Sequence, residues 1–147
     1  MGNKVPKLAK TDAEIEKCFD VMSELRTHLQ KEDFLATVRH MEKEGYKLVY
    51  IEDNGNIVAT AGYRIYNNLF MGKHLYIDDL VTSENLRSNG YGERLINWLR
   101  EQAIKANCKV LHLDSGTHRG EAHKFYFNQG FTIASYHFSE QLKNHNS

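Results

Sequence analysis

Two glycines and an arginine lie close together in the stretch LRSNGYGER, residues 86–94, just before a helix-forming segment. The start of a helix exposes unpaired backbone N–H groups and carries about half a positive charge, so it attracts phosphate groups. Gly90 and Gly92 lack a Cβ atom and let an anion approach the backbone, while Arg87 and Ser88 add side-chain donors. The stretch therefore predicts either an anion-binding turn or a turn whose glycines serve only the change from strand to helix.

The turn matches neither of two better-known phosphate-binding motifs. The phosphate loop of NTPases needs Gly-Lys-Ser/Thr, which YGERL does not contain. The dinucleotide fingerprint GxGxxG needs a third glycine where Leu95 stands, near the start of a parallel βαβ unit. Both alternatives fail on the residues present.

Asp78 and Asp79 are adjacent acids in YIDDLVT, the apolar stretch that precedes this turn. Neighbouring side chains of a strand point to opposite faces, so both carboxylates reach one site only where a β-bulge intervenes. A carboxylate here can accept a proton, directly or through water, or serve only as a structural hydrogen-bond acceptor. Both interpretations stay open for each aspartate, and Glu84 is a third acid nearby.

The hydrophobic pattern predicts the elements that must position these residues. In chain order we expect a strand, two helices, three strands, a helix, a strand, a helix and a last strand. Their ranges are 4–9, 12–29, 32–44, 46–53, 56–66, 74–82, 93–107, 109–114, 120–130 and 131–138. Asn54-Gly55 supplies the positive φ angles of a tight hairpin turn. The strands at 74–82 and 109–114, joined by a helix, should be parallel neighbours in a mixed sheet.

Composition is typical of one globular domain: 147 residues with 41% hydrophobic and 26% charged content. The formal net charge is zero, which argues against a nucleic-acid or anionic-membrane partner. Cys18 and Cys108 form no disulfide framework, and no apolar run is long enough for a membrane span, so we expect a cytoplasmic protein. Eight histidines show no metal-ligand spacing, and we expect no metal.

Two motifs together resemble a known family. Arg87, Gly90 and Gly92 form RxxGxG after an apolar strand, similar to the acetyl-CoA signature of the GNAT superfamily of N-acetyltransferases. AHKFYFNQGF, residues 122–131, resembles the closing motif of that family, with Tyr126 five residues before Phe131. The resemblance implies an α/β (α+β) fold with a mixed, largely antiparallel, splayed sheet of about six strands and about four helices. It implies a single N-acetyltransferase domain over 4–138, followed by a polar tail over 139–147.

The activity implied by the resemblance is transfer of an acetyl group from acetyl-CoA to a primary amine, by direct attack in a ternary complex. A small-molecule amine is favoured, and a protein or peptide amine is the alternative acceptor. The chain would act as a monomer or homodimer with no metal. A noncatalytic acyl-CoA-binding sensor and a nicotinamide-dependent oxidoreductase are the competing interpretations.

The resemblance also implies roles for individual residues. Pantetheine would pair with the backbone of residues 80–82, and the diphosphate would lie at the turn over 87–92. The implied cofactor-binding residues are Leu80, Val81, Thr82, Arg87, Ser88, Asn89, Gly90, Tyr91, Gly92, Ser115 and Ala122. The implied catalytic residues are Tyr126, which would donate a hydrogen bond to the leaving thiolate, and a general base, Asp79 first and Asp78 second.

The chain departs from the family pattern at Arg119, where asparagine is frequent. Basic residues here and the sequence HKFY resemble a subset that acetylates aminoalkylphosphonates. Three functions stay open for His118, Arg119, His123 and Lys124: binding the 3′-phosphate of the cofactor, binding an anionic group of the acceptor, or forming a solvated face. The expected border of the acceptor pocket comprises His28, His40, Phe70 and Met71.

Overall fold

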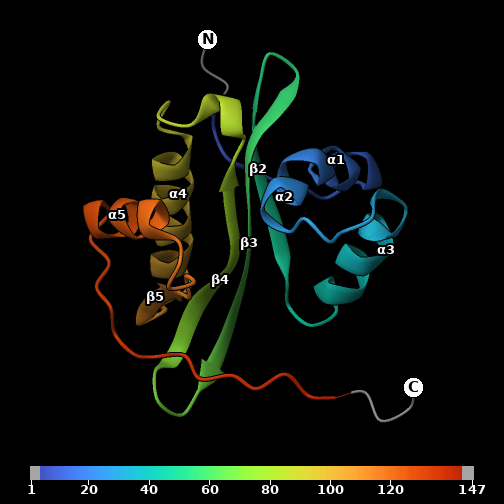
Figure 1. Ribbon diagram of the computed structural model, residues 1–147. Helices are drawn as coiled ribbons and strands as arrows, with labels where there is room; N and C mark the ends of the chain where they lie inside the picture. Colours follow the sequence, from blue (N-terminus) through green and yellow to red (C-terminus); the bar gives the residue numbers. More distant parts are fainter. Residues whose placement is uncertain (1–3, 144–147) are drawn as a thin grey trace. The chain divides into compact units, whose positions relative to one another are not determined.

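The computed structural model describes residues 4–143. The chain divides into two compact units, and the boundary between them in the sequence falls between Leu113 and Asp114. The first unit contains a five-stranded sheet in the order β1-β2-β3-β4-β5 (Figure 1). Its strands are β1 (Lys7–Leu8), β2 (Lys47–Asp53), β3 (Asn56–Asn68), β4 (Gly72–Thr82) and β5 (Val110–Leu113). Pairing is antiparallel from β1 through β4, whereas β5 is parallel to β4, as the crossover predicts.

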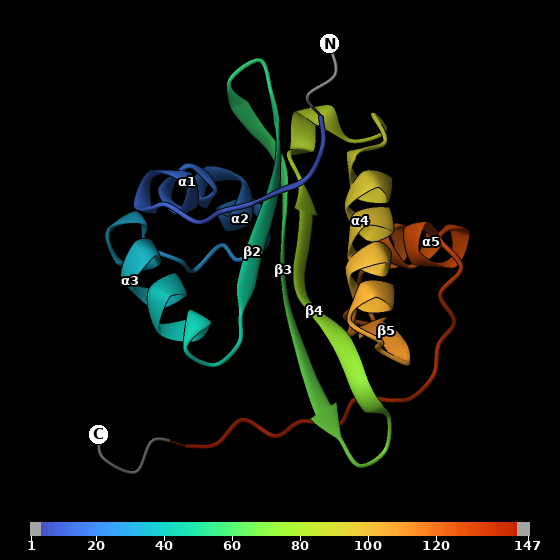
Figure 2. The ribbon, with the colours of Figure 1, turned by 180° about the vertical axis from the view of Figure 1, so that it is seen from behind.

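Helices cover both faces of this sheet, as Figures 1 and 2 show. One face carries α1 (Asp12–Lys17), α2 (Phe19–Leu25) and α3 (Lys31–Glu42), and the other carries α4 (Tyr91–Lys105). A short 3-10 helix, η1 (Glu84–Leu86), connects β4 to the turn before α4. None of the helices in the described part is long and apolar enough to cross a membrane.

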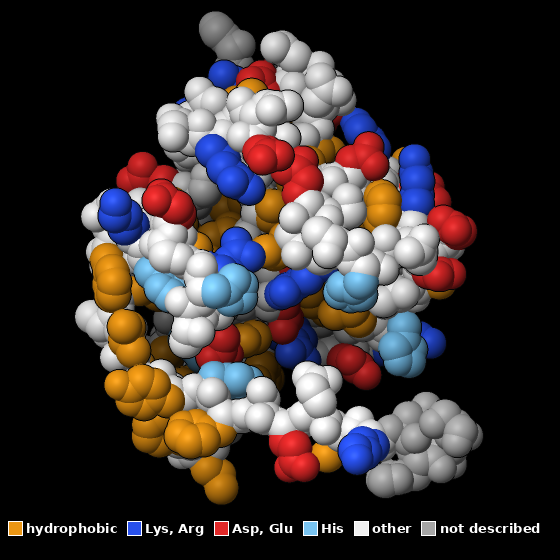
Figure 3. Space-filling view, in the orientation of Figure 1, with side chains coloured by type: hydrophobic (Ala, Val, Ile, Leu, Met, Phe, Trp, Pro, Cys, Tyr) orange, Lys and Arg blue, Asp and Glu red, His pale blue; other side chains and the backbone are white. Residues whose placement is uncertain are grey.

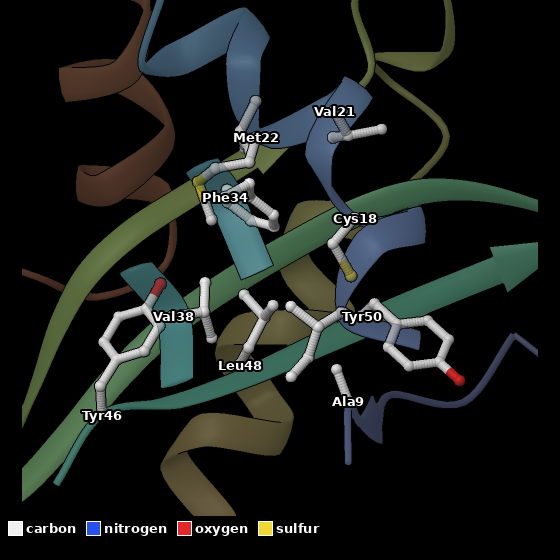
Figure 4. Close-up of a cluster of buried hydrophobic side chains, with 11 residues drawn as sticks. Ala9, Cys18, Val21, Met22, Phe34, Val38, Tyr46, Leu48 and Tyr50 are labelled. Carbon is white, nitrogen blue, oxygen red and sulfur yellow. The ribbon is translucent and has the colours of Figure 1, made fainter. Parts of the chain in front are cut away.

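Two apolar layers hold the first unit together. Beneath α1–α3, side chains such as Ile15, Cys18 and Leu48 are at most 1% exposed (Figure 4). Beneath α4, the side chains of Leu95, Ile96 and Leu99 are fully buried, and the ring of Trp98 lies edge-on against Tyr63 at 5.8 Å. Burying one such aliphatic side chain contributes about 1.5–3 kcal/mol, so each face fixes its helices firmly.

The predicted first helix is two helices. The expected range ran on to Leu29, but α1 ends at Lys17, α2 begins at Phe19, and α2 ends at Leu25. Between them the N–H of Cys18 donates to the carbonyl of Ile15 at 3.0 Å, a three-residue bond that tightens the turn and interrupts the α-helical ladder.

The prediction of a last strand over residues 131–138 is wrong. The described part of the second unit contains one helix, α5 (Gly120–Asn128), and its residues from 131 to 143 have no regular structure. Its alternating aromatic and β-branched residues favour a strand, but a strand exists only when a partner completes its hydrogen-bond ladder. The sheet therefore has five strands where about six were expected; of the predicted tail, residues 144–147 lie outside the described residues.

Candidate active site

A β-bulge in β4 brings the two adjacent aspartates to one face of the sheet. Gly62 of β3 pairs with Asp79, but the next residue, Tyr63, pairs with Ile77, so Asp78 is the extra residue. The carboxylate of Asp78 reaches Arg64, two residues along β3 from the partner of Asp79. The bulge therefore lets both carboxylates reach one face of the sheet, which regular strand alternation does not allow.

Both carboxylate oxygens of Asp79 accept hydrogen bonds from residues distant in sequence. Arg26 donates from Nε to Oδ1 at 2.8 Å, and Tyr46 donates from its hydroxyl to Oδ2 at 2.7 Å. Arg26 also donates from Nη2 to the carbonyl oxygen of Asp78 at 2.7 Å, and so clamps the bulge. With a side chain only 12% exposed, Asp79 is held in one position by two donors.

Tyr46 reaches Asp79 because α3 ends in a defined way. The N–H of Gly45 donates to Glu42 at 3.1 Å and that of Tyr46 to Met41 at 3.2 Å, with Gly45 at φ 92°. This is the Schellman arrangement, which needs a residue at positive φ. Figure 4 shows Tyr46 at one edge of the hydrophobic cluster. Burial, and then the charge of Asp79, raise the pKa of this phenol well above its usual value.

Gly62 makes room for the phenol of Tyr46. A Cβ atom at Gly62 would lie 1.8 Å from the Tyr46 hydroxyl oxygen and 2.3 Å from its ring carbon Cζ. Sequence reasoning identified neither residue as part of the site, and it also missed Arg26. A glycine followed by a tyrosine after a helix signals the helix end, but nothing local predicts a contact 33 residues away along the chain.

Asp78 has a different partner. Arg64 donates from Nε to Oδ2 at 3.0 Å and from Nη2 to Oδ1 at 2.9 Å, a two-pronged ion pair. The guanidinium also lies 5.8 Å from the centre of the Tyr66 ring. Burial raises the pKa of the Asp78 carboxyl from its ordinary value, and the hydrogen bonds from Arg64 oppose that shift. Asp78 therefore holds a proton more readily than a solvent-exposed aspartate.

The outer edge of β4 is unpaired beyond this bulge. Pairing with β5 ends at Ile77 and Leu113, whereas β4 continues to Thr82. Leu80, Val81 and Thr82 pair with β3 on one side. Within residues 4–143 no strand pairs with their other side, which leaves backbone groups there for a ligand.

The turn before α4 has the backbone that its sequence predicts. Ser88 and Gly90 both have positive φ, 74° and 83°, and no side chain caps the first turn of the helix. Space is open around Gly90, since a Cβ atom there would meet nothing within 4 Å. Arg87 is exposed, and Asn89 donates from its side chain to the carbonyl of Leu86 at 2.9 Å. The N–H groups at this helix start remain available to an anion.

Tyr91 takes part in this turn only through its backbone. Its ring is buried, and its hydroxyl donates to Oδ2 of Asp53 at 2.9 Å. The side chain therefore fastens the start of α4 to the end of β2, while Gly92 follows in the first helical turn.

The second unit holds Tyr126 by a local device. The N–H of Phe131 donates to the carbonyl of Tyr126 at 3.0 Å, and that of Gly130 donates to Phe127 at 3.1 Å. The rings of Tyr126 and Phe131 lie edge-on at 5.9 Å. The five-residue spacing in the closing motif is thus the spacing of a Schellman helix end, with its accompanying apolar contact.

Burial raises the pKa of the Tyr126 phenol, and the charge of Arg119 opposes that shift. Such a phenol stays protonated at neutral pH and can donate a hydrogen bond. In the same unit the hydroxyl oxygen of Ser115 is buried without a hydrogen-bond partner, and Ala122 lies in the first turns of α5. A buried hydroxyl with no protein partner is an atom that a ligand can satisfy.

A histidine pair lies on β4 and β5, where sequence reasoning predicted nothing. A ring nitrogen of His112 lies 2.8 Å from Nδ1 of His74, whose side chain is fully buried. Burial lowers the pKa of His74, which keeps it neutral. Among the residues that the structure describes, no group of three or more His, Cys, Asp or Glu side chains is arranged to hold a metal ion.

The open helix start, the paired aspartates and the ordered tyrosine match the motifs that resembled an acetyltransferase. The family model described as "Acetyltransferase (GNAT) family" covers residues 11–131, which begin in the first unit and end within the second. The chain belongs to the GNAT family. This confirms the resemblance drawn from the glycine turn and from the closing motif.

Among relatives of this GNAT protein, an uncharacterised N-acetyltransferase of Bacillus subtilis (strain 168), YhdJ, is 39% identical over 126 residues. The match covers 84% of this chain and 89% of YhdJ. The aminoalkylphosphonate N-acetyltransferase of Salmonella typhimurium is 26% identical over 90 residues, or 60% of this chain and 58% of that enzyme. Homologues with these names support acyl transfer as the general activity of the family.

Solved structures share the fold of this GNAT protein. The GNAT family acetyltransferase of Staphylococcus aureus has a TM-score of 0.78 at 19% identity, covering 94% of this chain and 98% of its own. The aminoglycoside N-acetyltransferase AAC(6')-Iy, solved in complex with CoA, has a TM-score of 0.81 at 12% identity, and 95% of each chain is covered. At these identities the comparison establishes the fold, and the GNAT architecture predicted from sequence is confirmed.

Proposed function

We propose that this GNAT protein transfers an acetyl group from acetyl-CoA to a primary amine, with a small-molecule acceptor favoured. The observation that carries the proposal is the end of β4–β5 pairing at Ile77, immediately before the bulge at Asp78. From this point an unpaired strand edge, two carboxylates and a helix start with available N–H groups follow one another along the chain. Acetyl-CoA would supply the activated acetyl group.

Residues of the first unit fit the donor. Backbone groups of Leu80, Val81 and Thr82 would pair with pantetheine as an added strand. The N–H groups from Ser88 to Gly92 would hold the diphosphate, assisted by the exposed side chain of Arg87. Ser115, with its unpartnered hydroxyl, and Ala122, both in the second unit, are the remaining residues that the family resemblance assigns to the donor.

Asp78 is the residue that we assign as proton acceptor. An amine with a pKa near 10.4 costs about 4.6 kcal/mol to deprotonate at pH 7, so a base nearby lowers a substantial barrier. Burial raises the pKa of Asp78, whereas Asp79 is held by Arg26 and Tyr46. Asp79, the first choice from sequence, becomes the residue that positions the bulge.

Tyr126 is the proposed donor to the leaving thiolate. Its phenol is protonated at neutral pH, and a thiolate with a pKa near 8.5 accepts a hydrogen bond from it as charge develops. The helix end at Gly130 and Phe131 bonds to the backbone of Tyr126, and the ring of Phe131 lies edge-on against the phenol.

Thiol release from acetyl-CoA across a panel of amines tests the proposal. The panel spans aminoalkylphosphonates, polyamines, amino sugars and lysine peptides. We expect turnover with at least one small amine, and a loss of about 100-fold in kcat for Tyr126→Phe with acetyl-CoA binding retained. Tyr136→Phe makes the same chemical change at an exposed site, 84% accessible, and should leave kcat unchanged.

The pH profile separates the acids. Asp78→Asn should remove the acidic limb of the kcat profile, Asp79→Asn should lower stability as well as kcat, and Glu84→Gln on η1 should do neither. Tight acetyl-CoA binding with no turnover on any amine would instead identify a noncatalytic acyl-CoA sensor. Binding of a nicotinamide cofactor in place of acetyl-CoA, seen as a thermal shift, would identify an oxidoreductase.

A further inference from the structure

Two arginines from different elements bind the same aspartate. Arg26, the residue that ends α2, donates from Nη2 to the backbone carbonyl of Asp78 at 2.7 Å and from Nε to Asp79 at 2.8 Å. Arg64 of β3 donates from Nε and Nη2 to the carboxylate of Asp78 at 3.0 and 2.9 Å. The two guanidinium groups therefore flank the acid that we assign as proton acceptor, one at its backbone and one at its side chain.

Neither guanidinium group uses all of its donors on these acids. An arginine has five N–H groups on three nitrogens, and Arg26 and Arg64 both bond through Nε and Nη2. Among residues 4–143, neither Nη1 group makes a hydrogen bond. The side chains of Arg26 and Arg64 are 43% and 33% exposed, so a small solute can reach them. Each arginine can bind an anion while it stays bonded to its aspartate.

Arg39 shows how an arginine that serves only the fold is bonded in the same unit. Its Nε and Nη2 donate to Asp12, Nη2 also donates to the carbonyl of Lys10, and Nη1 donates to both carboxylate oxygens of Glu42. All three nitrogens are engaged, and the network ties the start of α1 to α3. The two arginines of the candidate site differ because each of them keeps Nη1 for another partner.

The groups that face a ligand at Asp78 are held in place beforehand. The side chains of Asp79 and Asp78 are only 12% and 17% exposed, and each is fixed by a charge-assisted pair with an arginine. Groups that are already ordered lose less conformational entropy when a ligand binds. Each oxygen of the Asp78 carboxylate accepts one hydrogen bond from Arg64, and a carboxylate oxygen has two lone pairs. Asp78 can therefore also accept a hydrogen bond from an ammonium group.

The formal charges of this cluster balance. Its two carboxylates and two guanidinium groups sum to zero, as do the charges of the whole chain. In Figure 3, acidic and basic side chains of the described residues lie intermixed, and neither sign forms a broad patch on the face shown. A polyamine gains most from an excess of negative charge, which the cluster does not offer. A molecule with one ammonium and one oxyanion matches the alternating charges.

We propose that the Nη1 groups of Arg26 and Arg64 bind an oxyanion of the acceptor. The acceptor is then a small zwitterion, a primary amine with a carboxylate or a phosphonate on the same short carbon chain. The inference rests on the proposed acetyl transfer, whose acceptor it specifies. The ammonium group lies at the carboxylate of Asp78 and loses one proton to it before the amine attacks. Because Arg64 and Asp78 are one hydrogen bond apart, only a few carbon atoms separate the amine from the oxyanion.

A series of amines of similar length tests the proposal on the wild-type, full-length protein with acetyl-CoA. β-Alanine and aminoethylphosphonate carry the oxyanion, whereas β-alaninamide and propylamine lack it. Two charge-assisted bonds should raise kcat/KM for the charged acceptors about 100-fold over the uncharged ones. The carboxylate and phosphonate arms identify which oxyanion is preferred. Equal values for charged and uncharged acceptors, or a preference for propylamine or spermidine, would overturn the proposal.

Arginine variants distinguish binding of the oxyanion from positioning of the aspartates. Arg64→Gln and Arg26→Gln should each lower the ratio of kcat/KM for β-alanine to that for β-alaninamide about tenfold, because only the charged acceptor loses a contact. If the arginines only position the aspartates, both acceptors lose activity equally, and an unchanged ratio in both variants overturns the proposal. Arg39→Gln, the matched control, should leave the ratio and kcat unchanged. An unchanged urea transition of Trp98 emission shows that the first unit of each variant is folded.

Binding without turnover separates this inference from the proposed function. Isothermal titration of β-alanine and aminoethylphosphonate into the CoA-loaded protein requires no acetyl transfer. If no amine is acetylated, the proposed function fails, but binding that Arg64→Gln weakens about tenfold still supports the oxyanion site. If propylamine is acetylated and neither zwitterion binds, the proposed function stands and the oxyanion site is overturned. With neither turnover nor binding, both fail.

Discussion

The ends of α3 and α5 use the same local device and lead to different outcomes. Each helix stops at a glycine with φ of 92°, followed by an aromatic residue whose N–H bonds back to the helix: Gly45 with Tyr46, and Gly130 with Phe131. After Tyr46 the chain enters β2 and pairs on both sides. From Phe131 to residue 143, the last that the structure describes, the chain contains no strand. A helix end is specified locally, whereas a strand also needs a partner.

The largest expected effect is on stability, from a substitution that displaces Tyr46, the residue after the end of α3. Gly62→Ala places a methyl group where the Tyr46 phenol lies, and should lower the free energy of unfolding by about 3 kcal/mol. Urea denaturation measures the loss. In a Tyr46→Ala background the space is free, and the same Gly62→Ala change should cost under about 1 kcal/mol. Equal costs in both backgrounds would mean that Tyr46 is not what Gly62 accommodates.

A matched pair of substitutions compares the two helix ends directly. Gly45→Ala and Gly130→Ala each put a Cβ atom at positive φ in open space, so backbone strain alone should cost about 1–2 kcal/mol. The Gly45→Ala cost should appear in the urea transition of the first unit. The Gly130→Ala cost should appear as faster amide exchange in α5. If neither substitution lowers stability, the two helix ends do not depend on the positive φ of these glycines.

The aromatic residues that follow the two helix ends differ in one property: Tyr46 can ionise and Phe131 cannot. The pH dependence of the free energy of unfolding therefore tests Tyr46. The folded-state pKa of Tyr46 is raised, so its stabilising contribution is present below pH 10 and is lost as pH rises above the unfolded value of 10.0. By pH 11 one such tyrosine lowers the free energy of unfolding by about 1 kcal/mol. Tyr46→Phe should flatten the decline between pH 10 and 11, but only in part.

Two other tyrosines account for the decline in stability that remains in Tyr46→Phe. Burial also raises the pKa values of Tyr50 and Tyr63 to about 12, so these two should sustain part of the decline in Tyr46→Phe. An unaltered slope in Tyr46→Phe would contradict the raised pKa of Tyr46.

The smallest effect concerns the ring pair in the second unit. Phe131→Ala removes the edge-on contact with Tyr126 but leaves the backbone bonds of the helix end. Amide exchange at the end of α5 should show a loss of about 0.5–1 kcal/mol. Phe127→Ala, at a side chain 53% exposed, is the control for removing an aromatic group from α5. An equal loss in the control would assign no special stability to the pair.

Local signals in the sequence predicted most of the fold. Asn54-Gly55 indicated the β2–β3 turn, and both residues have positive φ as such a turn requires. The glycine turn before α4 was predicted for the same reason. The strand pattern of 131–138 was read correctly as a propensity, but propensity names no partner, and the predicted strand is absent from this chain.

The candidate site was predictable only in part, because its partners are distant in sequence. Asp78 and Asp79 drew attention as adjacent acids, and the bulge was named as the condition for their sharing a face. Nothing in the sequence located that bulge, or the arginine 53 residues away that holds it. Tyr126 was predicted from the closing motif. The five-residue spacing in that motif is also the spacing of a helix end, so one pattern had two physical causes.

The edge-on packing of Trp98 on Tyr63 makes the first unit its own optical reporter. Trp98 is the single tryptophan of the chain, and it lies on α4 against β3. Emission excited at the indole absorption edge therefore follows the separation of that helix from the sheet. A mismatch between indole emission and far-ultraviolet circular dichroism on heating would therefore reveal whether the two units melt in separate steps.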